Sequence, residues 1–375
     1  MDFSRAATAI EQAITTGAFP GAVLLVGRGD EILYHEAFGQ RSLEPTRTPM
    51  TRDIVFDLSS LTKALATTTA IMLLVREGKI RLDDRVSRFI PNFGVHGKIH
   101  VAIHHLLGHC SGLPAWRPFF KEVQRAERQG KFKFSGRRGA RAMVLDEIHR
   151  ERPEYETGTK AVYSDLGFLL LGELVELVSH QPLDRFCRER IFKPMHLRST
   201  AFIDLDRMRA QKLSPVTDMI APTERCAWRQ KVVCGEVHDD NAWAIGGVAG
   251  HAGLFASAED VHRIVARLAT CAADQDPFLP GGLVREFWRR EGSVPESTWA
   301  LGWDTPLPTG SMAGSRASAS TVGHLGFTGT SVWLDRERGA HVVFLTNRVH
   351  PRRDNERIKA VRPQVHDAVW EALDA

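Results

Sequence analysis

The sequence has no long hydrophobic run, few cysteines and almost no excess of either charge. No apolar stretch reaches the roughly 18 residues that a membrane-spanning helix needs, so we expect no transmembrane segment. Its 49 basic and 45 acidic side chains leave a net charge of +4, which is too small to indicate a nucleic-acid partner. The five cysteines are odd in number and scattered, which predicts reduced, mostly buried thiols and no disulfide framework. They are Cys110, Cys187, Cys226, Cys234 and Cys271.

Residues 1–17 follow an apolar pattern at helical spacing that Asp2 and Glu11 interrupt. They lack the basic start and the continuous apolar core of a secretory signal. We therefore expect a cytoplasmic protein, or a periplasmic one if a leader has been trimmed. Most of the small basic excess lies at residues 131–141, a segment with no signature of a nucleic-acid module. We interpret this segment as a solvated loop.

Several catalytic and cofactor motifs are also missing. No Gly-x-Ser-x-Gly elbow occurs, which argues against an α/β-hydrolase. Residues 246–253 are rich in glycine but lack the Gly-x-Gly-x-x-Gly spacing of a nucleotide site. His100, His104, His105 and His109 have no carboxylate or cysteine at ligand spacing, so we interpret them as structural or surface histidines. We expect neither a metal nor an organic cofactor.

Residues 60–63, Ser-Leu-Thr-Lys, lie where a long helical pattern begins. Residues three apart share one helix face, so the Ser60 hydroxyl and the Lys63 amine are expected to touch. A serine becomes nucleophilic when a base takes its proton, and a lysine whose pKa is lowered by burial can be that base. The Ser60 backbone N–H can face a developing oxyanion. Taken alone, the tetrapeptide fits a capping serine and a solvated lysine equally well.

Two later motifs place the Ser60–Lys63 pair in a wider pattern. Tyr-Ser-Asp at residues 163–165 opens a helical pattern, and His-Leu-Gly at residues 324–326 precedes a strand-like segment. This order resembles the penicillin-recognising serine hydrolases, the serine β-lactamase-like superfamily. With tyrosine in the middle motif, the chain resembles its class C β-lactamase, D-alanyl-D-alanine carboxypeptidase and esterase branch. Residues 106–114 and 246–255 are similar to that branch too, so the resemblance covers nearly the whole chain.

The resemblance implies a role for each matching residue. Ser60 would be the nucleophile, Lys63 its base, and Tyr163 the proton shuttle that protonates the leaving group and activates water. A phenol suits that task if neighbouring cations lower its pKa. The oxyanion hole would consist of the backbone N–H groups of Ser60 and Phe327. Gly326 would keep the strand edge open for an acyl group.

Two predicted substrate-binding positions depart from the lactamase pattern. Asp165 replaces an asparagine, and an ionised carboxylate cannot donate a hydrogen bond to an amide carbonyl. Beside Lys63 it would also raise the pKa of that lysine. His324 replaces the lysine that recognises the β-lactam carboxylate, and it offers a charge only when protonated. Both changes favour a neutral ester or amide substrate.

Strand patterns lie near both ends of the sequence and helical patterns lie between them. We predict strands at residues 21–26, 31–38, 299–303, 321–325, 331–334 and 341–346. We predict helices at residues 60–77, 166–179, 258–270 and 356–373, the last with a break or kink at Pro363. Residues 310–320 are predicted to be a flexible surface loop.

These elements predict a mixed α/β (α+β) fold. An antiparallel sheet built from both ends of the chain would be flanked by the N- and C-terminal helices. Residues 1–80 and 235–375 would form this α/β lobe, and residues 81–234 an inserted mainly helical lobe. The resemblance implies the same fold, with the active site between the lobes.

The sequence therefore predicts a serine hydrolase that acts through an acyl-enzyme on a small ester or amide, most simply a carboxylesterase-like enzyme. A D,D-carboxypeptidase, penicillin-binding protein or class C-like β-lactamase is the alternative within the same fold. A catalytically silent ligand-binding or scaffold protein is the alternative of another class. The sequence does not indicate an oligomeric state.

Overall fold

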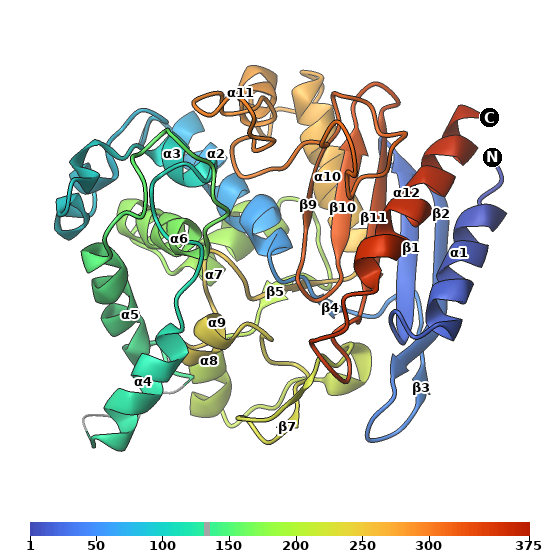
Figure 1. The fold of residues 1–375 in the computed structure, drawn as a ribbon, viewed down its shortest axis with the longest axis horizontal. Helices are drawn as coiled ribbons and strands as arrows, with labels where there is room; N and C mark the ends of the chain where they lie inside the picture. Colours follow the sequence, from blue (N-terminus) through green and yellow to red (C-terminus); the bar gives the residue numbers. More distant parts are fainter. Residues whose placement is uncertain (131–135) are drawn as a thin grey trace.

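The computed structural model describes residues 1–130 and 136–375, and its main sheet is antiparallel throughout. Within these residues the sheet has six strands in the order β3-β2-β1-β11-β10-β9. They are β1 (Gly21–Arg28), β2 (Glu31–Ser42), β3 (Thr48–Pro49), β9 (Val322–Leu325), β10 (Ser331–Asp335) and β11 (Ala340–Thr346). Ala22 of β1 lies opposite Thr346 of β11, so the two ends of the chain meet in the middle of the sheet (Figure 1).

The two faces of the sheet bury different layers of helices. Successive strand residues point to opposite faces, so β1 divides its apolar side chains between two cores. Ala22 and Leu24 pack with α1 (Ser4–Thr15) and α12 (Ile358–Asp374), whereas Val23 and Leu25 belong to the larger core that contains α10 (Ala258–Ala272). Figure 1 shows α1 and α12 together on one side of the sheet.

The remaining helices lie mostly between the two groups of strands in sequence. They are α2 (Thr69–Arg76), α3 (Ile103–Leu107), α4 (Phe119–Arg128), α5 (Gly139–Arg150), α6 (Asp165–Ser179), α7 (Leu183–Cys187), α8 (Leu205–Ala210), α9 (Asp240–Ala244) and α11 (Gly281–Phe287). Short 3₁₀ turns occupy Val86–Arg88, Pro91–Gly94, Lys98–His100 and Thr217–Met219, and Arg188–Phe192 is π-helical. Among the described residues, no helix is both long and apolar enough to cross a membrane.

Two small sheets complete the described structure. One joins β4 (Phe56–Asp57), β8 (Leu254–Ala256) and β5 (Ala201–Phe202), and the other joins β6 (Arg225–Cys226) and β7 (Lys231–Val232). The predicted class, an antiparallel sheet flanked by terminal helices with further helices inserted, is confirmed. The exact lobe boundaries stay a prediction. All five cysteines are free, as expected, and only Cys234 is not fully buried.

The helix expected at residues 60–77 is not a uniform α-helix. Lys63–Thr68 is π-helical, and α2 continues from Thr69. A π-helical turn widens the helix, and such turns are frequent at functional sites. Gly78 ends the helix with φ +66°, the left-handed conformation expected of a glycine at this position.

Three further expectations about local structure are wrong. Residues 299–303 form isolated bridges and a turn at Gly302, which has φ +78°, and they form no strand. α12 continues through Pro363 without a break, because that proline removes one hydrogen bond from a helix that is otherwise well packed. Residues 310–320 are packed on α12, where Trp370 Nε1 donates a hydrogen bond to the carbonyl oxygen of Ala313 at 2.8 Å.

Within the basic segment at residues 131–141, the described residues 136–141 are not the solvated loop that the sequence suggested. Residues 131–135 lie outside the described residues. Arg138 lies 2.6 Å from Asp184, and Arg141, on α5, forms an ion pair with Glu176. These ion pairs anchor the described part of the segment to neighbouring helices.

Candidate active site

Ser60 lies in a tight turn directly before the helix, and Asp57 of β4 holds that turn. The buried Asp57 side chain accepts hydrogen bonds from the backbone N–H groups of Ser59, at 2.8 Å, and His238, at 2.6 Å. Ser59 has φ +49°, a left-handed conformation that residues other than glycine rarely adopt. The Asp57 side chain thus stabilises the strained backbone that presents Ser60.

Lys63 is completely buried beside Ser60. Its Nζ lies 3.0 Å from Ser60 Oγ, 3.0 Å from the carbonyl oxygen of His251 and 2.7 Å from Asp165 Oδ1. It also lies 4.8 Å from the centre of the Tyr163 ring. The predicted contact between Ser60 and Lys63 is confirmed, whereas the solvated lysine that the tetrapeptide alone left open is wrong.

The charge on Lys63 differs from the sequence expectation. Burial by itself lowers the pKa of Lys63, as predicted, but the Asp165 carboxylate and Tyr163 act in the opposite direction and raise it above its ordinary value. Lys63 is therefore an ammonium group at rest, paired with Asp165. The predicted effect of Asp165 on this lysine is confirmed, and it outweighs burial.

Tyr163 is fixed from both sides by His109. The His109 carbonyl oxygen accepts a hydrogen bond from Val162 N–H at 2.8 Å, and its ring Nδ1 accepts one from Ser164 N–H at 3.1 Å. Ser164 then caps α6 by accepting from Gly167 N–H. The phenol is consequently placed beside Lys63 and Ser60, and both groups act to lower its pKa.

The pKa of the Tyr163 phenol is raised, which is opposite to the sequence expectation. Burial raises it most, Asp165 adds to that effect, and Lys63 lowers it by less. The phenol ring stacks on Trp299 with ring centres 5.3 Å apart. His109 contacts both rings, at 4.7 Å from Tyr163 and 4.5 Å from Trp299. Tyr163 therefore holds its proton inside an aromatic cluster.

The turn between β9 and β10 is tied to the Ser60 turn by two hydroxyl groups. Thr328 Oγ1 donates a hydrogen bond to the Asp57 carbonyl oxygen at 2.7 Å, and Thr330 Oγ1 donates one to that of Leu58 at 3.1 Å. A Cβ at Gly326 would lie 2.0 Å from Thr330 Oγ1 and 2.6 Å from the Leu58 carbonyl oxygen. Glycine is thus required for close packing of the two turns, a different reason from the open strand edge that the sequence suggested.

The two backbone N–H groups predicted for the oxyanion hole lie on these linked turns. Neither Ser60 N–H nor Phe327 N–H has a hydrogen-bond acceptor within residues 1–130 and 136–375. The Phe327 carbonyl accepts a hydrogen bond from Arg348 Nε at 2.8 Å, and the guanidinium covers the Phe327 ring at 4.4 Å. These contacts fix the peptide next to Phe327 N–H, which leaves two oriented donors for an anionic oxygen.

His324 is buried and neutral. Its Nδ1–H donates to the Leu325 carbonyl oxygen at 2.8 Å, and its Nε2 has no partner among the described residues. Burial and the nearby Lys63 lower the pKa of His324 to about 3. The conditional charge that the sequence suggested is therefore wrong, since His324 carries no charge between pH 5 and 8. It instead offers a hydrogen-bond acceptor.

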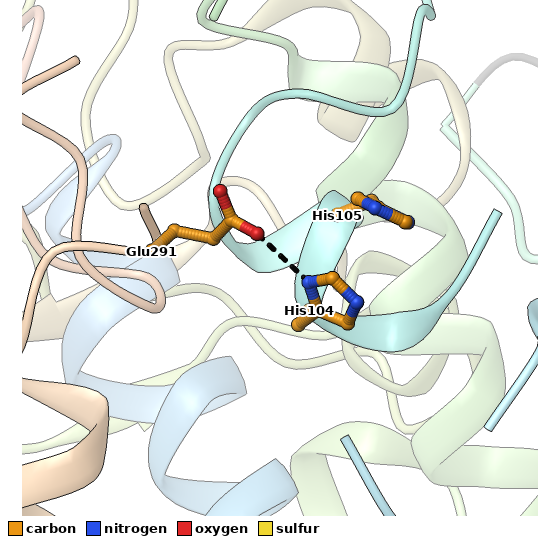
Figure 2. A group of neighbouring side chains, drawn as sticks. All are labelled: His104, His105 and Glu291. Atoms are coloured by element: carbon orange, nitrogen blue, oxygen red, sulfur yellow. Dashed lines mark hydrogen bonds and ion pairs between the residues drawn. The ribbon is translucent and has the colours of Figure 1, made fainter. Parts of the chain in front are cut away.

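One histidine cluster has a carboxylate that the sequence spacing did not reveal. The ligand atoms of His104, His105 and Glu291 lie within 4.8 Å of one another, and His104 Nδ1 lies 2.8 Å from Glu291 Oε1 (Figure 2). His105 Nδ1, however, accepts the backbone N–H of Ala102 at 3.0 Å, which occupies its lone pair. Glu291 also accepts two hydrogen bonds from Ser293. The cluster fits a hydrogen-bonded link between α3 and a distant loop better than a metal site.

A second group, Asp165, Asp239 and His251, lies beside Lys63 with ligand atoms within 4.8 Å of one another. His251 Nε2 lies 2.9 Å from Asp239 Oδ1, and the Lys63 ammonium already neutralises Asp165. Two members of the group contact the lysine, Asp165 through its carboxylate and His251 through its backbone carbonyl oxygen. Trp299 was predicted only as the first residue of a strand, and nothing in its local pattern marks it as a residue of the site.

Two curated relatives are similar to this chain over most of its length. An N-acetylmuramyl-L-alanine amidase of Bacillus subtilis (strain 168) is 32% identical over 91% of this chain and 80% of its own length. A protein of Escherichia coli (strain K12), whose name proposes a D-alanyl-D-alanine carboxypeptidase, is 30% identical over 91% of this chain and 81% of its own length.

Solved structures share the fold at lower identity. EstCE1, described as a hydrolase with promiscuous acyltransferase activity, superposes with a TM-score of 0.71 at 23% identity and covers 98% of both chains. Unliganded simvastatin synthase (LovD) from Aspergillus terreus superposes with a TM-score of 0.72 at 17% identity and covers 99% of both chains. The beta-lactamase family pattern matches residues 6–366. The chain is therefore a member of the beta-lactamase family of serine hydrolases.

Proposed function

We propose that this protein hydrolyses a small, neutral ester or amide through an acyl-enzyme on Ser60, as a carboxylesterase-like enzyme. The observation that carries the proposal is the 3.0 Å contact between Ser60 Oγ and the buried Lys63 Nζ. Tyr163 supports it from a position within hydrogen-bonding reach of both groups. The unpaired N–H groups of Ser60 and Phe327 supply the donors that an oxyanion needs.

The proton path follows from the charges at the site. In acylation, Ser60 Oγ bonds to the substrate carbonyl carbon while its proton passes to neutral Lys63. The carbonyl oxygen, now negative, accepts hydrogen bonds from the two N–H groups. Tyr163 then protonates the leaving group as the carbonyl re-forms and the bond to the leaving group breaks, and the Lys63 ammonium returns a proton to Tyr163. In deacylation the same two groups take a proton from water and return one to Ser60. Because Asp165 favours the ammonium form of Lys63, the reactive form is a minor one at neutral pH.

The charges around the site support a neutral substrate. Asp165 offers a carboxylate and His324 an uncharged acceptor where lactamase relatives place an amide and a lysine. Neither group attracts a substrate carboxylate. A second candidate, cleavage of a muramyl or D-alanyl amide, is favoured by the names of the relatives at 30–32% identity.

One experiment separates these candidates. The protein is incubated with a fluorophosphonate probe, a penicillin, a short aryl ester and a D-alanyl-D-alanine peptide. Intact mass and peptide mapping locate any adduct. Ester turnover with a fluorophosphonate adduct on Ser60 and no stable penicilloyl adduct is the expected result. A penicilloyl adduct or release of D-alanine would replace the esterase proposal by the second candidate, and a protein that forms no adduct and turns over nothing would contradict both.

Replacing Asp165 by asparagine is expected to move the acid limb of the kcat/KM profile to lower pH. Asp165 raises the pKa of Lys63, and only neutral Lys63 accepts the Ser60 proton, so wild-type activity increases as pH rises through that pKa. Without the carboxylate the pKa of Lys63 falls, and kcat/KM at pH 7 rises severalfold.

The control for this prediction is Asp239→Asn. Asp239 accepts hydrogen bonds from the His251 ring and from Ala242 N–H through one oxygen, and an asparagine oxygen preserves both. Its profile should keep the wild-type position. An Asp165→Asn profile that is lowered uniformly, with its acid limb unmoved, would show that Asp165 does not control the charge of Lys63.

His324 is expected not to discriminate between neutral and negatively charged substrates over the physiological pH range. Because its pKa is about 3, the ratio of kcat/KM for a neutral ester and its carboxylate-bearing analogue should stay constant from about pH 5.5 to 8. Asp304, whose burial raises its pKa to about 6, is the nearby group that does titrate there. A ratio that changes near pH 6.5 in both wild type and Asp304→Asn, but not in His324→Gln, would contradict the neutral assignment.

A further inference from the structure

A cavity of about 650 Å³ lies beside the small sheet of β4, β8 and β5, and its walls contain neither Ser60 nor the residues that contact Ser60. Val55, Phe202 and Phe255 form part of its wall, and none of the residues assigned to the active site lines it. Its volume lies within the range of roughly 300–1,000 Å³ that is typical of small-molecule sites. The walls are predominantly apolar. The cavity is thus suited to a hydrocarbon chain and is separate from the catalytic machinery.

Three large apolar side chains at the rim of this cavity are exposed to solvent. Leu213 is 54% exposed, Val216 72% and Met219 40%, and all three belong to the segment that follows α8. Single exposed apolar side chains are common, but a group of them around an apolar cavity is typical of a binding site. Covering these side chains would remove apolar surface from water, which is favourable.

The free charge at the cavity is positive. Arg198 and Arg207 both line it, and neither guanidinium has an ion-pair or hydrogen-bond partner among the described residues. Asp184 and Asp204 share the cavity and lie 2.6 Å and 3.1 Å from Arg138, whose single positive charge offsets one of their two negative charges, so that with Arg198 and Arg207 the group has a net charge of about +1. Arginine presents a planar set of N–H donors that matches a carboxylate. The rim therefore complements an anionic head group.

We propose that this cavity binds one free fatty carboxylate of medium chain length. The alkyl chain would lie against Phe202, Phe255 and Val216, and the carboxylate would pair with Arg198 and Arg207. Phe202 of β5 and Phe255 of β8 bound the cavity on one side and the segment after α8 bounds it on the other, and its open side lets one alkyl chain enter. The site is separate from Ser60, so this proposal can be tested independently of the proposed function.

The test is calorimetric titration of the Ser60→Ala protein with decanoate below its micellar concentration. Decanol and decyltrimethylammonium serve as neutral and cationic ligands of the same chain length. Decanoate should bind with one-to-one stoichiometry, at least tenfold more tightly than either. Arg198→Gln with Arg207→Gln should weaken decanoate at least tenfold and leave decanol unchanged, while Val216→Asp should weaken both decanoate and decanol. Arg188→Gln, an exposed arginine paired with Glu189, is the matched control and should have no effect.

Other outcomes would overturn the proposal. If decanoate binds equally well to the double arginine variant, the ligand occupies a different place, such as the acyl pocket beside Ser60. Equal affinity for decanol and decanoate would show that the arginines do not bind the carboxylate. Cosedimentation with phosphatidylglycerol vesicles without stoichiometric decanoate binding would make this face a membrane-contact surface, and no binding of any ligand would reject the site. The double arginine variant should hydrolyse the short aryl ester at the wild-type rate.

Discussion

Replacing Ser60 by alanine is expected to abolish covalent labelling and to reduce turnover at least on the order of a thousandfold. The change removes one partly exposed hydroxyl, while the hydrogen bonds that hold the turn come from the backbone of Ser59 and from Asp57. The fold should therefore be retained. Fluorophosphonate labelling followed by peptide mapping measures the first effect, and thermal unfolding checks the second.

Ser59 provides a matched control for this prediction. It is the neighbouring serine, its φ of +49° suits glycine, and its backbone N–H bond to Asp57 survives the change to glycine. Ser59→Gly should be labelled to a similar extent as the wild type. An adduct found on a different serine in the Ser60→Ala protein would remove Ser60 from the mechanism.

Lys63→Ala and Tyr163→Phe are each expected to lower kcat/KM by on the order of a hundredfold or more, the usual contribution of a positioned acid–base group. Both groups contact Ser60, and the lysine also lies against the phenol ring. Because they share one proton path, the double variant should lose much less than the product of the two single losses. Steady-state kinetics on the short aryl ester, with burst amplitudes, gives the three values.

Tyr155 is the matched phenol control. Its hydroxyl donates a long hydrogen bond of 3.4 Å to the His109 carbonyl oxygen and does not reach Ser60. Tyr155→Phe should cost little activity. Losses for Lys63→Ala and Tyr163→Phe that multiply strictly in the double variant would mean that the two groups handle different protons.

The parts of this molecule that depend on local pattern could be predicted from sequence. The strand patterns near residues 21–42 and 322–346 are short apolar runs bounded by turn residues, which is enough to place the sheet. The order of the motifs along the chain was sufficient to assign Ser60, Lys63 and Tyr163 to one site, because these motifs match a known arrangement. The contact of Ser60 with Lys63 also follows from their spacing, even though the helix is π-helical from Lys63 onward.

Charge states could not be predicted, because they depend on burial and on partners distant in sequence. Lys63 meets Asp165 only in the folded chain, and this contact reverses the effect of burial on the lysine pKa. His324 is deprived of its charge by its complete burial, which its motif does not reveal. Likewise, Glu291 reaches His104 across 187 positions of the chain, so sequence spacing gave no carboxylate there.

The pairing of β1 with β11 determines when during synthesis this protein is able to fold. The pair joins residues 22–28 to residues 340–346, so the middle of the sheet is missing until residues 340–346 have left the ribosome. Ser60 emerges early, but Phe327 and the strands β9 and β10 on either side of it emerge late. Contacts of such long range are slow to form, and an unpaired β1 exposes a hydrophobic strand in the meantime. The nascent chain should therefore depend on chaperones that shield strand edges, and it should acquire its oxyanion hole and its stable sheet in the same final step.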